Sequence, residues 1–229
     1  MSLTRHASEH PPEPAPADTL PLDRNAPGQT ETATFALGCF WGPDAYFGSR
    51  PGVVRTRVGY AGGGKDNPSY HDLGRHIETV EVDYDPAVLS YEDLLEHFWT
   101  QHNPTRPSLK RQYQSAIFYR NDDQERIARA SMQSEADKRG DLVTELIALD
   151  TFYLAESYHQ KYQLRHHDAL LGELKSVYDE NQLVNSTVAA RLNGLVTGYG
   201  RAEWYKEEIE RYGLSSDGDD AVVELIARL

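Results

Sequence analysis

The chain contains a single cysteine, which lies in the segment Gly38-Cys39-Phe40-Trp41-Gly42. A strand is expected before this cysteine and a helix after it, so its sulfur should lie near a helix N-terminus. Unpaired backbone N–H groups and the helix dipole stabilise a thiolate at such a position and lower its pKa. The segment therefore predicts a sulfur nucleophile, with an inert buried thiol as the alternative.

Glu78 is a second candidate for chemistry, because the strand that starts there alternates in polarity. Glu78 shares a face with Val80 and Val82, whereas Glu81 and Asp83 fall on the other face and are expected to point outward. Burial among apolar side chains raises the pKa of a carboxyl group and lets it hold a proton near neutrality. Glu78 is thus a candidate proton donor. The alternative, that Glu78 lies in solvent at the start of the strand, has equal weight.

The aromatic residues Phe40 and Trp41 follow the cysteine directly. They could line a pocket for an apolar methyl group, or they could be ordinary core residues.

A single cysteine excludes an intramolecular disulfide and any cysteine-based zinc site. Glu156 and His159 have metal-competent helical spacing but no matching second pair, so we expect no metal or organic cofactor. The glycine-rich run before Lys65 nearly fits a phosphate-binding loop but lacks the Ser or Thr that this motif requires.

The elements that position these residues follow the order β-α-β-β-α-β. This order predicts an α+β protein with a ferredoxin-like core and additional C-terminal helices. The predicted strands are 34–37, 53–60, 78–84, 113–119 and 143–149, and the predicted helices are 41–48, a helix capped by Ser90, 122–138 capped by Asn121, and 155–177.

Three regions of different composition are expected along the chain. Residues 1–31 are rich in Pro, Glu and Ala and predict a disordered N-terminal tail. Residues 32–212 should form the domain that carries the reactive groups. Residues 213–229 predict an acidic linker followed by a short amphipathic helix, 221–229.

The net charge of the chain limits the classes of molecule that it is expected to bind. The 229 residues carry a formal net charge of −13, which argues against nucleic acid and anionic membranes. No apolar run approaches the roughly 18 residues of a transmembrane helix, and the N-terminus lacks the apolar core of a signal peptide. We therefore expect a cytoplasmic protein.

Taken in order, the motifs of this chain resemble those of the class A peptide methionine sulfoxide reductases. The resemblance runs from about residue 32 to residue 200. The matching segments are residues 38–42, 58–63, 67–70, 76–78, 85–86, 102–105, 112–115 and 155–160.

This resemblance implies a role for each matched residue. Cys39 attacks the sulfoxide sulfur, and Glu78 protonates the sulfoxide oxygen. Tyr70 and Tyr113 help to hold that oxygen, while the pair of aromatic residues after the cysteine holds the substrate methyl group. The chain departs from the family pattern in a shortened loop before Glu78, with Arg75 where glycine is usual, and in Ser108, which replaces an aspartate. These departures bear most on the role of Tyr70.

The resemblance predicts reduction of the S epimer of methionine sulfoxide, both in oxidised proteins and as the free amino acid. Cys39 would become a sulfenic acid, as expected for a thiol that takes up oxygen. The resolving cysteines of the usual family member are missing. An external thiol is therefore expected to regenerate Cys39: thioredoxin, a glutaredoxin system or a small thiol. A thiol peroxidase and a non-catalytic binder of oxidised methionine are the alternatives.

Overall fold

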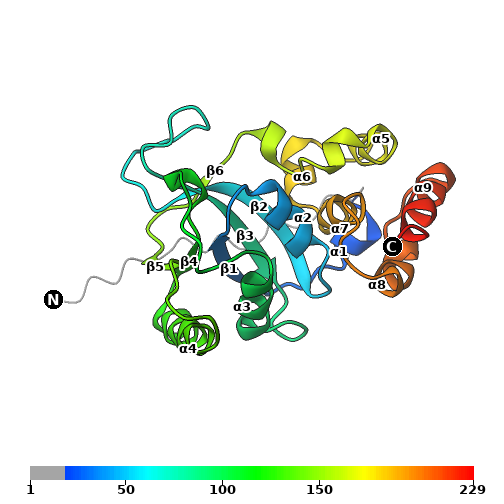
Figure 1. Cartoon of the computed structure of the whole chain (residues 1–229). Helices are drawn as coiled ribbons and strands as arrows, with labels where there is room; N and C mark the ends of the chain where they lie inside the picture. Colours follow the sequence, from blue (N-terminus) through cyan, green and yellow to red (C-terminus); the bar gives the residue numbers. More distant parts are fainter. Residues whose placement is uncertain (1–18) are drawn as a thin grey trace.

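A six-stranded sheet forms the centre of the computed structural model, which describes residues 19–229 (Figure 1). The strands are β1 (Glu31–Ala36), β2 (Val53–Ala61), β3 (Ile77–Tyr84), β4 (Ala116–Tyr119), β5 (Glu145–Ala148) and β6 (Tyr153–Leu154). The α-helices are α1 (Pro21–Arg24), α2 (Trp41–Gly48), α3 (Tyr91–Thr100), α4 (Asp122–Arg139), α5 (Asp168–Lys175), α6 (Glu180–Asn185), α7 (Thr187–Leu195), α8 (Ala202–Glu208) and α9 (Ser216–Ile226). Short 3-10 helices are η1 (Arg111–Tyr113), η2 (Ser157–His159), η3 (Leu164–His166) and η4 (Ile209–Arg211).

The sheet has the strand order β5-β4-β1-β3-β2-β6. Strand β1 pairs antiparallel with β3 and β4, and β2 pairs antiparallel with β3. The four strands β4-β1-β3-β2 thus form the predicted ferredoxin-like core, with α2 and α3 as its two connecting helices. Strand β5 adds a parallel edge beside β4, and β6 adds an antiparallel edge beside β2.

Helices α2, α3 and α4 cover one face of the sheet, where an aromatic cluster fills the main core. The ring of Phe35 stacks on Phe47 of α2 at 5.5 Å and on Phe98 of α3 at 5.2 Å between ring centroids. Burying each such ring stabilises the fold by about 1.5–3 kcal/mol. The predicted caps are confirmed, because Ser90 accepts a hydrogen bond from the Asp93 N–H and Asn121 accepts one from the Gln124 N–H.

Glu81 and Asp83 lie on the opposite face of β3, as the alternation predicted, but they are only 7% and 5% exposed. The predicted outer face is confirmed, but side chains rather than solvent cover the two carboxylates. Arg57 donates to Asp83 at 2.9 Å and to Glu81 at 3.3 Å, and Arg120 pairs with Glu81 as well. These guanidinium groups cover the carboxylates, and the paired charges lower the cost of burying them.

Two predicted elements differ from the structure because long-range contacts override local preference. The predicted strand 113–119 is shorter, since η1 ends at Tyr113 and β4 begins at Ala116. The predicted helix 155–177 is broken into η2, η3 and α5. Gln160 explains the break: its side-chain oxygen accepts from the Val58 N–H at 2.9 Å, and its amide donates to the Val58 carbonyl at 2.7 Å. This docking holds the segment against the edge of β2.

The N-terminal prediction is wrong for the residues that precede β1. Residues 21–24 form α1, and Leu20 and Leu22 are buried in a second core that also contains α5, α7 and α9. Residues 1–18, the rest of the predicted disordered tail, lie outside the described residues.

The predicted acidic linker near the C-terminus is also wrong. Ser215 caps α9, and the acidic residues that follow occupy the first turn of that helix, where the helix dipole favours negative charge. The helices at the right of Figure 1 thus form one packed unit that includes α9.

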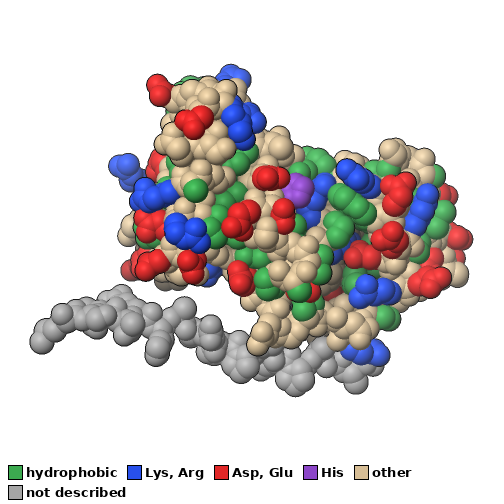
Figure 2. All heavy atoms as spheres, turned by 90° about the horizontal axis from the view of Figure 1, so that it is seen from below, with side chains coloured by type: hydrophobic (Ala, Val, Ile, Leu, Met, Phe, Trp, Pro, Cys, Tyr) green, Lys and Arg blue, Asp and Glu red, His purple; other side chains and the backbone are tan. Residues whose placement is uncertain are grey.

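The surface reflects the acidic composition. On the face seen in Figure 2, Asp and Glu side chains are spread among Lys and Arg and do not gather into one patch. Within residues 19–229, no helix has both the length and the apolar character needed to span a membrane.

Candidate active site

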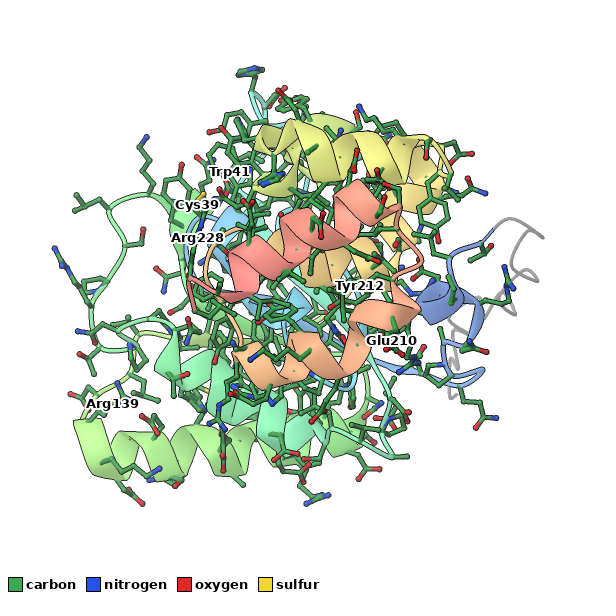
Figure 3. The ribbon with its side chains drawn as sticks, turned by 90° about the vertical axis from the view of Figure 1, so that its right-hand side faces the viewer. Cys39, Trp41, Arg139, Glu210, Tyr212 and Arg228 are labelled. Atoms are coloured by element: carbon green, nitrogen blue, oxygen red, sulfur yellow. The ribbon has the colours of Figure 1, made fainter. Side chains whose placement is uncertain are left out.

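Cys39 lies in a tight turn between β1 and α2. Gly38 adopts a φ of +104°, which lies outside the range that residues with side chains readily reach, and this turns the chain sharply before the cysteine. The Cys39 side chain is exposed, and α2 begins two residues later. Figure 3 shows its sulfur at the surface next to Trp41. The alternative of a buried, inert thiol does not apply.

The acidity of the thiol differs from the prediction. A hydrogen bond from the backbone N–H of Trp41 lowers the pKa of Cys39, as expected at the start of a helix. Desolvation outweighs this effect, and the negative charge of Glu78 adds to it, so the net pKa of Cys39 is raised. The prediction of a lowered pKa is wrong, because it considered the helix and neglected the partly desolvated setting and the nearby carboxylate.

The raised pKa leads to a test by alkylation. The rate of iodoacetamide modification of Cys39 should titrate with a higher midpoint in the native protein than in urea, because unfolding restores solvation. Replacing Glu78 with glutamine should lower the native midpoint, since Glu78 is ionised in the pH range where the thiol titrates. Alkylation rates between pH 6 and 11 give both midpoints. A native midpoint below that in urea would contradict the dominant role of desolvation.

Glu78 lies on the face of β3 that faces the helices and is 1% exposed. One carboxylate oxygen accepts a hydrogen bond from the Phe40 N–H at 3.1 Å, and the other accepts from the Gln112 side-chain amide at 2.5 Å. Desolvation raises the pKa of Glu78, and the two donors oppose this shift without cancelling it. The alternative of a solvated Glu78 is excluded. A carboxyl group with this pKa can hold a proton closer to neutrality than a solvated one.

Tyr113 lies near the Glu78 carboxyl group, and Tyr70 lies near Tyr113. The pKa of Tyr113 responds to the Tyr70 hydroxyl and to the charges of Glu78 and Cys39. Desolvation, the largest cause, raises the pKa of Tyr113 to about 12, so this hydroxyl keeps its proton at neutral pH. The fold thus brings four of the predicted site residues together: Cys39, Glu78, Tyr70 and Tyr113.

The two aromatic residues after the cysteine have different environments. Phe40 is 1% exposed and packs on Tyr60, so it belongs to the core beneath the site. Trp41 is partly exposed and stacks on Tyr162, with 3.6 Å between ring centroids and 3° between ring planes. A stacked indole of this kind is a rigid apolar wall, and Trp41 is the better placed of the two to contact a methyl group.

His159 and Glu156 support this wall and were not predicted as site residues. The Trp41 indole N–H donates to His159 Nδ1 at 3.1 Å, which leaves Nδ1 without a proton. Desolvation lowers the pKa of His159 and keeps the ring neutral. Glu156 accepts hydrogen bonds from the Tyr60 hydroxyl at 2.7 Å and the Tyr70 N–H at 3.0 Å. Two features of the sequence point to them: their spacing of three residues, and their position in the segment 155–160 that resembles the family.

Gln112, which donates to Glu78, lies in the segment 112–115 that resembles the family, but no role was predicted for it. Among residues 19–229, no cluster of three or more His, Cys, Asp or Glu side chains could hold a metal ion. The hydrogen bonds of Glu156 and His159 instead connect the loop of Tyr70 to the indole of Trp41.

The shortened loop before Glu78 is held by His76. This histidine is 2% exposed, and its ring accepts from the Gly63 N–H at 3.1 Å and bonds the Lys65 carbonyl at 2.8 Å. Arg75 takes a φ of +72°, the left-handed conformation that glycine adopts most easily, so the turn forms without glycine. Ser108 bonds the Lys110 carbonyl with its hydroxyl and shapes its own loop.

A buried polar network anchors α2 and therefore the cysteine turn. Asp44 accepts from Lys161 Nζ at 3.0 Å and from the Thr56 hydroxyl at 2.5 Å, and Asn193 of α7 donates to it at 3.2 Å. Asp44 and Lys161 are both fully buried. Gly48 brings α2 and α7 close together, because a Cβ there would lie 2.6 Å from the Ala190 carbonyl oxygen. The C-terminal helices thus support the helix that follows Cys39.

Replacing Lys161 with methionine should destabilise the protein by about 3–5 kcal/mol, because it leaves the Asp44 carboxylate buried without its cation. Urea unfolding measures this change. Replacing Lys65, whose pair with Asp72 is exposed, is the matched control and should cost at most about 1 kcal/mol. Equal losses for the two variants would contradict the anchoring role of Asp44.

Two family models match the chain. The model described as peptide methionine sulfoxide reductase matches residues 31–191, which include every site residue described above. A second model, described as the helical domain of selenoprotein methionine sulfoxide reductase A, matches residues 177–227. The second match covers α6 to α9, the helices that pack at one end of the sheet.

Individual proteins that are similar to this chain belong to the same family as the two matched models. A peptide methionine sulfoxide reductase of Drosophila melanogaster is 44% identical over 188 residues, which cover 80% of this chain and 75% of that protein. One from Methanothermobacter thermautotrophicus is 46% identical over 144 residues, which cover 58% of this chain and 85% of that protein. The solved structure of methionine sulfoxide reductase A of Corynebacterium diphtheriae superposes with a TM-score of 0.58 at 33% identity, covering 63% of this chain and 78% of that one. The chain therefore belongs to the peptide methionine sulfoxide reductase family and is an oxidoreductase.

Proposed function

We propose that this enzyme reduces the S epimer of methionine sulfoxide through a sulfenic acid on Cys39, which an external thiol then reduces. The observation that carries the proposal is the pairing of an exposed thiol with a buried carboxyl group of raised pKa, Glu78. The hydrogen bond between Phe40 N–H and Glu78 connects the cysteine turn directly to that carboxyl group.

The site supplies both halves of the reaction. The Cys39 thiolate attacks the sulfoxide sulfur, and a new sulfur–sulfur bond forms while Glu78 gives its proton to the oxygen. The hydroxyl then moves from the methionine sulfur to the Cys39 sulfur while the sulfur–sulfur bond breaks. This step releases methionine and leaves a sulfenic acid on Cys39. Tyr113 and Tyr70 donate hydrogen bonds to the oxygen while its charge develops, and Trp41 contacts the methyl group.

The enzyme needs an external reductant because the 229 residues contain no second cysteine. A thiol attacks the sulfenic acid, releases water and forms a mixed disulfide with Cys39. A second thiol then releases Cys39 and leaves as the oxidised disulfide. Thioredoxin, a glutaredoxin system and small thiols all supply this chemistry, and the preference for the S epimer rests on the resemblance to class A enzymes.

The test is one turnover without reductant on each separated epimer of methionine sulfoxide. We expect about one methionine per enzyme from the S epimer, none from the R epimer, and a gain of one oxygen in the mass of the protein. Adding dithiothreitol should convert the burst into steady turnover. A burst on the R epimer, or steady turnover without added thiol, would contradict the proposal.

The same experiment, repeated with hydrogen peroxide as the substrate, separates the proposal from its two alternatives. A thiol peroxidase would react faster with hydrogen peroxide than with methionine sulfoxide, because Cys39 would be tuned to attack the peroxide oxygen. A protein that only binds oxidised methionine would retain the sulfoxide and release no methionine. Glu78 favours the reductase over a binding protein, because binding alone does not require a proton donor beside the sulfur.

A further inference from the structure

A groove of about 560 Å³ lies directly beside the site described above. Leu37, two residues before the cysteine, and Tyr113 form the side that the groove shares with the site. The opposite side is the loop between α3 and β4, which carries Pro107 and Leu109. In Figure 3 the green loop that follows α3 lies at the same edge of the molecule as Cys39. The groove therefore begins where the substrate sulfur would be bound.

The charge of this groove is opposite to that of the protein. The chain has a net charge of −13, yet none of the residues that line the groove is Asp or Glu. Arg106 and Lys110 both line it and are both exposed. Neither side chain takes part in an ion pair within the described part of the chain, whereas Arg111 next to them pairs with Glu145. Two cations without a carboxylate partner leave this groove suited to an anionic ligand.

The groove also offers apolar contact. Leu109 is fully exposed at its edge, and Leu37 and Pro107 add further apolar surface. The volume is several times that of one side chain, so the groove can hold a short stretch of polypeptide.

We propose that this groove binds the polypeptide on one side of the oxidised methionine and prefers segments that carry Asp or Glu. The inference rests on the proposed function, because the groove has this role only if the sulfoxide is bound beside Cys39. Arg106 and Lys110 attract the acidic side chain, and Leu109 packs against an apolar neighbour. Free methionine sulfoxide does not reach the groove and gains nothing from it.

The experiment compares short peptides with a central S-methionine sulfoxide flanked on both sides by Glu, Gln or Lys, together with free methionine sulfoxide. Single-turnover rates without thiol are measured at several peptide concentrations. We expect the rate at limiting peptide to be about tenfold higher for the Glu peptide than for the Lys peptide, since two exposed pairs each contribute modestly. In 1 M NaCl, where the screening length is about 3 Å, the preference should fall to less than about twofold.

The variant that tests the groove is Arg106→Glu combined with Lys110→Glu. It should lose or reverse the preference for the Glu peptide and leave the rate on free methionine sulfoxide unchanged. The matched control combines Arg126→Glu with Lys206→Glu, which changes the net charge equally at exposed positions of α4 and α8. This control should keep the preference.

Three results would overturn the inference: equal rates for the three peptides, a preference that survives in the groove variant, or an equal loss in the control. A defect seen only in thiol-dependent turnover, with a normal burst, would assign the groove to the reductant and would also overturn it. Failure of the proposed function itself is recognised separately, because free methionine sulfoxide would then give no burst in any variant.

Discussion

Replacement of Cys39 by serine is expected to reduce the single-turnover yield from about one methionine per enzyme to none. The chain has no other cysteine, so no second thiol can take over the attack on the sulfoxide. A serine hydroxyl does not ionise near neutrality and does not attack the sulfoxide sulfur. Quantification of released methionine after mixing enzyme with S-methionine sulfoxide, without thiol, measures the loss.

The fold of this variant serves as its control. Cys39 is exposed, so the exchange of sulfur for oxygen should change the free energy of unfolding by no more than about 0.5 kcal/mol. The intact protein should take up one equivalent of iodoacetamide and the variant none. A folded serine variant that still releases methionine would refute the reaction through Cys39.

Replacement of Glu78 by glutamine is expected to slow the burst by about 10²–10⁴-fold, the usual contribution of a general acid. Glutamine keeps the size of the side chain and one hydrogen-bond acceptor, but it has no proton to transfer to the leaving oxygen. The amplitude should remain about one methionine per enzyme, because the thiol is intact. Rapid-quench measurement of methionine formation gives both the rate and the amplitude.

The matched control is Glu81→Gln, on the same strand but on its opposite face. Glu81 pairs with Arg57 and Arg120, away from the cysteine. This variant should lower the stability of the protein, because Arg120 loses the carboxylate that it pairs with and Arg57 keeps only Asp83, while its burst rate stays within about twofold of the original. Equal slowing in both variants would show that Glu78 acts only through the stability of β3.

The pH dependence of the burst separates the two ionisations. The reactive form has Cys39 ionised and Glu78 protonated, so the pair carries one proton in total. Desolvation raises the pKa of both groups, and the carboxyl group remains the more acidic of the two. The rate at limiting substrate should therefore rise with pH through the pKa of Glu78, stay level, and fall through the pKa of Cys39. In Glu78→Gln the rate should only rise, through the thiol pKa.

Local sequence patterns predicted many of the strands and helices that hold Cys39 and Glu78. The alternation that begins at Glu78 correctly assigned its face of β3, because strand geometry sends neighbouring side chains to opposite sides. Ser90 and Asn121 correctly marked the first turns of α3 and α4, since a cap bonds to N–H groups only three residues away. The order of these elements was enough to predict the ferredoxin-like core.

Properties that depend on distant residues were not predictable in this way. Gln160 bonds the backbone of Val58, which lies 102 positions earlier, and so prevents a continuous helix in a segment of helical composition. Leu20 and Leu22 are buried by helices from the other end of the chain. Arg106 and Lys110 were unremarkable in the sequence, and the tertiary structure, as described for residues 19–229, places them in a groove whose lining contains no Asp or Glu.

The sequence by itself determined which chemistry is possible: one thiol, in a glycine-flanked turn before a helix, and one carboxyl group on an apolar strand face. Only the tertiary structure decided how acidic these groups are and what surrounds them. Ionisation depends on desolvation and on charges a few ångströms away, and both are set by the packing of β3 against the cysteine turn. The pKa of Cys39 is therefore raised where the local pattern predicted a lowered one, whereas the pKa of Glu78 is raised as predicted.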